Sequence, residues 1–255
     1  EDRVLRNSAI EGLGMTVGLK DFPQLVDNML AMGSSASANS MKEALRKACQ
    51  RMGDRDAAAK VLLDRTVSAS AVAQTELMDL LVYVGGEQAL AGLKSAAESN
   101  EDSAADAATR ALGKWLTPDA APLLLELATS GNTKFRVRCL RGYIRIIRQF
   151  GLKSGQRLQM SKQAFAAATR DEERKLVLDT LTRFPLVQGL SMITPHLNTP
   201  SLSEDASKAA VRIGEQIVDH DPKSVAAAMK KVVAVAKDRE TVDRAQVLIA
   251  RSTSN

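Results

Sequence analysis

The sequence predicts an all-α protein built as an array of helical repeats. First, a helix-sized apolar phrase returns about every 34 residues along the 255-residue chain, and such spacing is typical of solenoids. Second, no segment shows the period-two alternation of strands. Third, 45% of the residues are hydrophobic but only 3% are aromatic. The core must therefore consist of Ala, Leu, Val, Ile and Met, which form or tolerate helices.

The repeated phrase marks one helix of each repeat. Copies occur at residues 9–14, 48–53, 80–85, 108–113, 139–140, 177–178, 209–214 and 245–246. Because the connections between helices are short, we expect each copy to lie on the second helix of an antiparallel pair. Residues 1–15 then form a second helix without its first partner. This indicates a segment of a longer protein, or a chain from which a leader has been removed.

Helix boundaries are expected at residues with capping chemistry. The expected starts lie at Asp21, Asp54, Ser103, Thr117, Asp171, Thr199 to Ser201, Asp221 and Asp238. Ser103 with Asp106, and Ser201 with Glu204, have the spacing of a capping box. The expected turns and stops lie at residues 33–40, Gly53, Gly85 with Gly86, and residues 131–133. These marks separate about fifteen helices of roughly 12 to 18 residues.

Charge divides a single array, residues 1–255, into two halves. Residues 1–132 hold 13 basic and 18 acidic side chains, whereas residues 133–255 hold 22 basic and 12 acidic ones. Such asymmetry indicates a basic half that binds a partner, or two halves that contact different domains.

The best candidate site is a stripe of cations in the basic half. Between Glu126 and Asp171 there are ten basic residues and no carboxylate. Five of them are spaced four, three, four and three residues apart, which places them on one helix face. We call them the basic stripe: Lys134, Arg138, Arg141, Arg145 and Arg148. On the opposite face, Cys139, Leu140, Tyr143, Ile147 and Phe150 are expected to be core.

Two interpretations of the basic stripe remain open. Arginine makes bidentate contacts with phosphate and carboxylate, so the stripe could bind an anion. Alternatively, it is a solvated face paired with acids of adjacent repeats, such as Asp106, Glu172 or Glu173, and we favour this second interpretation. Nucleic-acid binding is compatible with an isoelectric point near 9.3, but stacking residues are scarce.

Other chemistry has little support in the sequence. His196 and His220 are the only histidines, and neither belongs to a cluster with metal-ligand spacing. Cys49 and Cys139 are expected to be small buried hydrophobes without a disulfide between them. No apolar run approaches the length of a membrane span. We therefore expect no catalysis, no cofactor, no metal, no small-molecule substrate and no membrane partner.

The second-helix phrases at residues 46–53, 107–113 and 208–214 resemble HEAT repeats of the armadillo-like class, and Pro23 and Pro195 fit the kinked first helices of that family. The resemblance covers essentially the whole chain. It implies a right-handed α-solenoid of about seven antiparallel helix pairs, with the second helices on the concave side. Residues 139–145 and 171–175 also look like HEAT segments of exported bacterial proteins, in which the array is attached to a sugar-hydrolase-like or cytochrome-like domain.

Together these features predict a non-catalytic binding or scaffolding module. Its expected partner is another protein or an attached domain of the same protein. The alternative is a binder of nucleic acid or another polyanion through the arginine-rich helix near residues 133–150. A third and weaker alternative is an enzyme similar to HEAT-like DNA glycosylases or lyases. We favour an exported or periplasmic location over a cytoplasmic one.

Overall fold

The computed structural model describes residues 3–33, 37–130 and 134–253. These residues form fifteen α-helices and two short 3₁₀ helices, and none of them lies in a strand. The prediction of an all-α protein is therefore confirmed. The chain divides into two compact units, Glu1–Gly142 and Tyr143–Asn255, which we describe separately.

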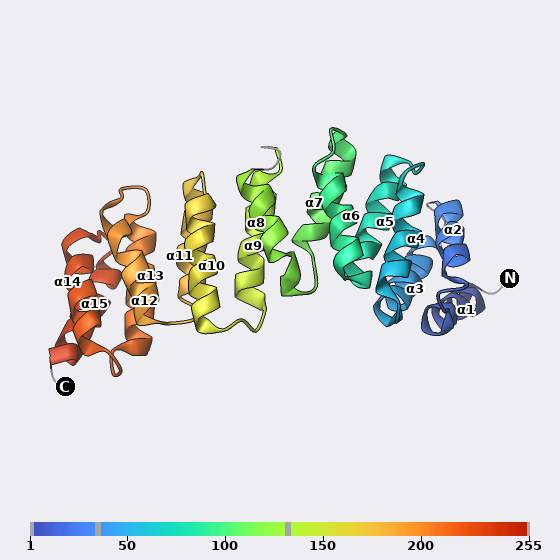
Figure 1. Ribbon diagram of the computed structural model, residues 1–255. Helices are drawn as coiled ribbons and strands as arrows, with labels where there is room; N and C mark the ends of the chain where they lie inside the picture. The colour runs from blue at the N-terminus through green and yellow to red at the C-terminus, as the bar shows by residue number, and fades with distance from the viewer. Residues whose placement is uncertain (1–2, 34–36, 131–133, 254–255) are drawn as a thin grey trace. The chain divides into compact units, whose positions relative to one another are not determined.

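The first unit contains eight complete α-helices, labelled in Figure 1. They are α1 (Arg3–Thr16), α2 (Phe22–Met32), α3 (Ala38–Arg51), α4 (Arg55–Thr66), α5 (Ala71–Val84), α6 (Glu87–Ala97), α7 (Asp102–Gly113) and α8 (Ala121–Thr129), the last preceded by the 3₁₀ helix Pro118–Ala120. Helix α9 (Arg136–Gln149) crosses from the first unit to the second.

The second unit contains six further α-helices. They are α10 (Ser154–Ala167), α11 (Asp171–Leu181), α12 (Val187–Ile193), α13 (Ser203–Ile217), α14 (Pro222–Val235) and α15 (Arg239–Thr253), with a 3₁₀ helix η2 (Thr194–Asn198) that continues α12. Two helices are clearly shorter than the 12 to 18 residues expected from the sequence: α12 has 7 residues and α8 has 9. In both cases a 3₁₀ helix directly adjoins the α-helix and extends the helical segment.

Alternate helices pack together in each unit. In the first unit α1 contacts α3, α3 contacts α5 and α5 contacts α7, while α2 contacts α4 and α4 contacts α6. In the second unit α11 contacts α13, α13 contacts α15 and α12 contacts α14. Helices α2, α4, α6, α10, α12 and α14 also pack on the odd-numbered helix that follows each of them. All eight copies of the repeated phrase lie on odd-numbered helices or at their ends, as the sequence predicts.

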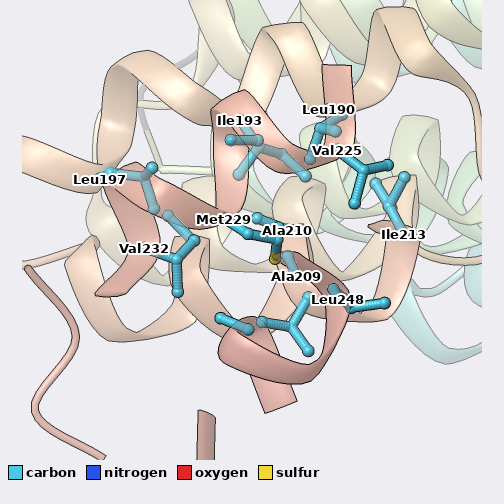
Figure 2. Packing of buried hydrophobic residues seen from close by; sticks show 14 of the residues in the cluster. Leu190, Ile193, Leu197, Ala209, Ala210, Ile213, Val225, Met229, Val232 and Leu248 are labelled. Carbon is cyan, nitrogen blue, oxygen red and sulfur yellow. The ribbon is translucent and has the colours of Figure 1, made fainter. Parts of the chain in front are cut away.

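The core is aliphatic, as the low aromatic content requires. In the second unit Leu190 and Ile193 of α12, Ile213 of α13 and Met229 of α14 are at most 2% exposed and pack in one cluster (Figure 2). Small residues let helices approach closely elsewhere. A Cβ atom on Gly14 of α1 would lie 2.6 Å from the backbone of Ala44 in α3.

Several helix boundaries agree with the capping residues. The Asp54 carboxylate accepts a hydrogen bond from the Ala57 amide at 2.9 Å, and the Asp221 carboxylate accepts one from the Ser224 amide at 3.0 Å. Gly85 and Gly86 both adopt positive φ, +67° and +88°, a backbone conformation that glycine adopts without strain. Asp21 precedes α2, although its side chain makes no capping bond.

The two predicted capping boxes do not form. Helix α7 begins one residue before Ser103, whose hydroxyl donates to the Glu101 carboxylate at 2.6 Å instead of capping the helix. Helix α13 begins at Ser203, so Ser201 lies in the preceding turn. The predicted turn at residues 131–133 and part of the loop at 33–40 lie outside the described residues. Within the described ranges, no helix is both long and apolar enough to cross a bilayer.

Candidate site on the basic face of helix α9

Helix α9 separates apolar and cationic side chains, as its spacing predicts. Cys139, Leu140, Tyr143 and Ile147 are at most 3% exposed, while Phe150 after the helix is only partly buried. Burial raises the pKa of the Tyr143 hydroxyl to about 12 and that of the Cys139 thiol to about 11. Both groups are therefore neutral at physiological pH and belong to the packing of the helix.

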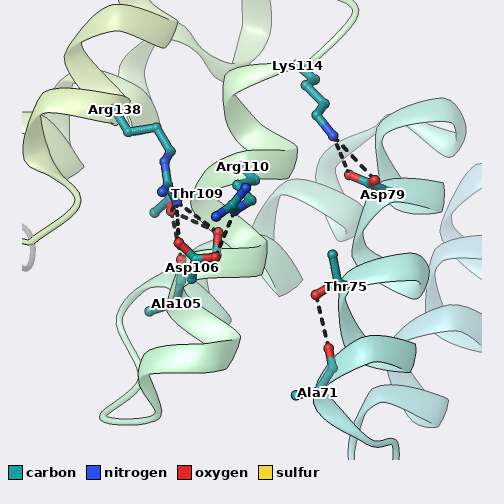
Figure 3. A network of polar contacts seen from close by, with 9 residues as sticks. All are labelled: Ala71, Thr75, Asp79, Ala105, Asp106, Thr109, Arg110, Lys114 and Arg138. Atoms are coloured by element: carbon teal, nitrogen blue, oxygen red, sulfur yellow. Dashed lines mark hydrogen bonds and ion pairs between the residues drawn. The ribbon is translucent and has the colours of Figure 1, made fainter.

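The first two cations of the basic stripe contact α7 within the first unit. Lys134, just before α9, lies 2.6 Å from a carboxylate oxygen of Asp102. Arg138 donates from Nη1 to the Asp106 carboxylate at 2.8 Å, to the Asp106 carbonyl at 3.1 Å and to the Thr109 hydroxyl at 2.9 Å (Figure 3). These contacts hold the N-terminal part of α9 against α7.

Asp106 is shared between two arginines. Arg110 of α7 donates to its second carboxylate oxygen at 2.7 Å (Figure 3). Partial burial opposes ionisation of Asp106, but the hydrogen bonds from Arg110 and Arg138 outweigh it, so the pKa of Asp106 is lowered. The carboxylate is therefore ionised when both guanidinium groups are present.

The remaining cations of the basic stripe have different surroundings. Arg141 is exposed. In the second unit, Arg145 donates to the Gln149 side chain at 2.9 Å and lies 5.7 Å from the centre of the Phe150 ring. Burial lowers the pKa of the Arg145 guanidinium. Arg148 lies 3.4 Å from a carboxylate oxygen of Asp179 on α11.

Lys134, Arg138 and Arg148 are thus paired with acids of neighbouring odd-numbered helices. The sequence pointed to Asp106, but it did not point to Asp102 or Asp179. Glu172 and Glu173, the other acids considered, contact Arg170 instead. Glu173 is 1% exposed and receives two hydrogen bonds of 2.8 Å from Arg170.

Ion pairs of the same kind connect each odd-numbered helix, or the residue beside it, to the next odd-numbered helix. We call this series the ion-pair ladder. In the first unit its rungs are Glu11–Lys47, Lys42–Glu76, Asp79–Lys114, Asp102–Lys134 and Asp106–Arg138. In the second unit they are Arg148–Asp179, Lys175–Asp205, Asp179–Arg212, Glu215–Arg244 and Asp219–Arg251.

The ladder follows the repeat in the sequence. The separation between its partners is 36 residues for Glu11 and Lys47 and 29 residues for Glu215 and Arg244. Opposite charges one repeat apart on second helices were therefore the signal that could have identified these pairs. Even-numbered helices are also connected by such pairs, for example Asp27–Arg65 at 2.6 Å and Lys94–Glu126 at 2.6 Å.

Other candidate groups are part of the packing. His196 of η2 stacks on Phe165, with ring centres 4.2 Å apart, and burial, followed by the charge of Arg174, lowers its pKa. Cys49 and Cys139 are free and buried, as predicted. Among the described residues, no three His, Cys, Asp or Glu side chains are grouped so that they could hold a metal ion.

Comparison with known proteins identifies no family for this chain. No protein-family model matches the chain, and no curated protein matches it. Among solved structures, the chain is similar to one engineered protein from the Northeast Structural Genomics Consortium with 16% identity and a TM-score of 0.41, covering 98% of this chain and 74% of the other. A second engineered protein from that consortium is 18% identical with a TM-score of 0.29, covering 92% and 97%. These scores are too low to support an argument about function.

Proposed function

We propose that this chain is a non-catalytic binding module. It presents the solvent-facing side chains of its odd-numbered helices to another protein or to an attached domain. The ion-pair ladder is the observation that carries this proposal. It links consecutive helices of one layer, so their polar side chains form a surface that is continuous within each unit. Repeat proteins use such extended surfaces to bind partners.

We also infer that residues 1–255 form one HEAT-like right-handed solenoid with the odd-numbered helices on its concave side. The contacts between alternate helices and the repeat spacing of the ladder support this inference. Small-angle X-ray scattering tests it, because a continuous solenoid has a longer maximum dimension than two units folded against each other. An exported location rests on the resemblance to HEAT segments alone.

Binding of nucleic acid along the whole basic stripe is less well supported. Lys134, Arg138 and Arg148 already neutralise carboxylates of neighbouring helices. A polyanion would have to displace these pairs, and that displacement offsets the gain from counterion release.

A charge-reversal comparison tests the proposed binding layer. Arg110→Glu with Lys114→Glu changes two exposed positions, one on α7 and one at its C-terminal cap, while Lys60→Glu with Lys230→Glu makes the same charge change on even-numbered helices. Each protein would be cross-linked in an extract of its source cells, and its covalent partners identified by mass spectrometry. We expect the α7 variant to lose a partner that the control variant retains. Equal retention by both variants, or a wild-type chain without a partner, would contradict the proposal.

A further inference from the structure

One carboxylate in the ladder serves three arginines. Asp179 on α11 lies 3.4 Å from Arg148 of α9, 3.5 Å from Arg212 of α13 and 3.9 Å from Arg183, which follows α11. All four residues belong to the second unit. In the other rungs of the ladder that contain an arginine, the guanidinium nitrogen lies only 2.8 or 3.0 Å from the carboxylate oxygen.

The long distances leave hydrogen-bonding capacity on the guanidinium groups. Charge-assisted hydrogen bonds between arginine and carboxylate are normally about 2.7 to 2.9 Å long. Across the described ranges, Asp179 is the carboxylate that contacts Arg148, Arg183 and Arg212, and each of these contacts is 3.4 Å or longer. Each guanidinium has five N–H donors in a fixed plane, so the exposed Arg183 and Arg212 can hold additional oxygen atoms.

A groove of about 240 Å³ opens beside this cluster. It lies between α11 and α13 and is lined by Asp179, Thr182, Lys208 and Arg212, among others. Lys175 and Asp205, 3.1 Å apart, form part of its wall and neutralise each other. Arg212 and Arg183 are 55% and 51% exposed, whereas Arg148 is only 25% exposed. Two guanidinium groups are thus accessible from solvent, and the third lies deeper in the protein.

The charge of the cluster indicates the charge of its ligand. Three arginines and one aspartate carry a net charge of about +2 at neutral pH, when each has its usual ionisation state. A phosphate monoester carries about −1.5 to −2 at pH 7 and has three acceptor oxygens. We propose that the groove between α11 and α13 is a binding site for a phosphate monoester group, held by Arg212 and Lys208, which line it. Arg183 contributes its charge from beside Asp179.

The phosphate site does not depend on the proposed scaffold function. It needs only three neighbouring helices of the second unit, and it uses Arg148 alone from the basic stripe. The phosphate could belong to a small phosphorylated molecule or to a phosphorylated side chain of a partner. The chemistry of recognition is the same in both cases.

Isothermal titration calorimetry of the full chain tests the site, with inorganic phosphate and a phosphoserine peptide as probes at low ionic strength and pH 7.5. We expect saturable binding to the wild type. Arg212→Gln should weaken it about tenfold or more, because a charge-assisted hydrogen bond is lost. Arg239→Gln is the matched control, since Arg239 is 95% exposed on α15. Asp179→Asn should tighten binding, because it removes the carboxylate that competes with phosphate.

The two probes distinguish the source of the phosphate. Tighter binding of the phosphoserine peptide than of inorganic phosphate favours a phosphorylated partner, whereas equal binding favours a small molecule. The unphosphorylated peptide should not bind at this site. Absence of saturable phosphate binding to the wild type would overturn the proposal, and so would an equal loss of affinity in Arg212→Gln and Arg239→Gln. Thermal unfolding of each variant checks that it remains folded.

Discussion

Arg138 and Asp106 lie 32 residues apart in the sequence, and the Arg138 guanidinium contacts the Asp106 carboxylate at 2.8 Å. The two residues stand on α9 and α7, consecutive members of the odd-numbered layer. The contact shows how this chain connects its repeats, because one cation reaches a carboxylate, a carbonyl and a hydroxyl on the preceding odd-numbered helix.

This contact predicts that replacing Arg138 lowers the free energy of unfolding more than replacing Arg110, the other arginine that contacts Asp106. Arg138→Gln should lower the free energy of unfolding by about 1 to 2 kcal/mol, because it removes an ion pair within a network and two further hydrogen bonds. Arg110→Gln, which breaks a pair within α7, should cost only about 0.3 to 0.5 kcal/mol. Urea unfolding followed by circular dichroism measures both values, and equal costs would mean that Arg138 does not join the helices.

Gly14 and Gly12 should respond in opposite directions to replacement by alanine. A Cβ atom at Gly14 would lie 2.6 Å from the Ala44 backbone, whereas nothing lies within 4 Å of one at Gly12. We expect Gly14→Ala to destabilise the protein by about 1 to 3 kcal/mol through overpacking. Gly12→Ala should stabilise it by up to about 1 kcal/mol, since alanine is the better helix former. Thermal unfolding gives the sign of each change, and destabilisation of similar size in both variants would argue against a close approach of α1 and α3.

His196 should make stability depend on pH. Burial, followed by the positive charge of Arg174, lowers its pKa below the usual 6.5. Below pH 6.5 the unfolded chain therefore binds more protons than the folded chain, so this contribution to stability is complete above that pH and is lost as the pH falls.

Replacement by phenylalanine isolates this effect. His196→Phe keeps a ring against Phe165 but cannot titrate, so its melting temperature should fall less than that of the wild type between pH 7 and pH 5. His220→Phe, at an exposed histidine after α13, controls for the loss of an imidazole. If the His196 variant and the wild type lose stability in parallel, the partly buried His196 does not titrate as described.

The sequence predicted the helices better than the contacts between them. The apolar phrase identified the odd-numbered helices because burial of Leu140 or Ala209 depends on local periodicity. Capping was predicted less well: Ser103 has the right spacing, but the structure pairs its hydroxyl with Glu101. A capping side chain has several nearby hydrogen-bond partners of similar energy. Which partner it bonds depends on how the whole helix packs.

The basic stripe illustrates the same limit. Its five cations could be placed on one helix face from spacing alone, but their partners depend on how α7 and α11 pack against α9. Asp179 could not be assigned to three arginines, because Arg148 and Arg212 come from different helices. The hand of a solenoid likewise depends on a small rotation between repeats, which no local pattern encodes.

Within each unit, the odd-numbered helices form a layer held together by ion pairs one repeat apart. Zero-length coupling of lysine to carboxylate with a carbodiimide, followed by peptide mass spectrometry, tests it most directly. The ladder predicts covalent links Glu11–Lys47, Asp79–Lys114, Asp102–Lys134 and Lys175–Asp205, whose partners lie 2.6 to 3.1 Å apart. Links dominated by residues two or more repeats apart, or the absence of these four, would contradict it.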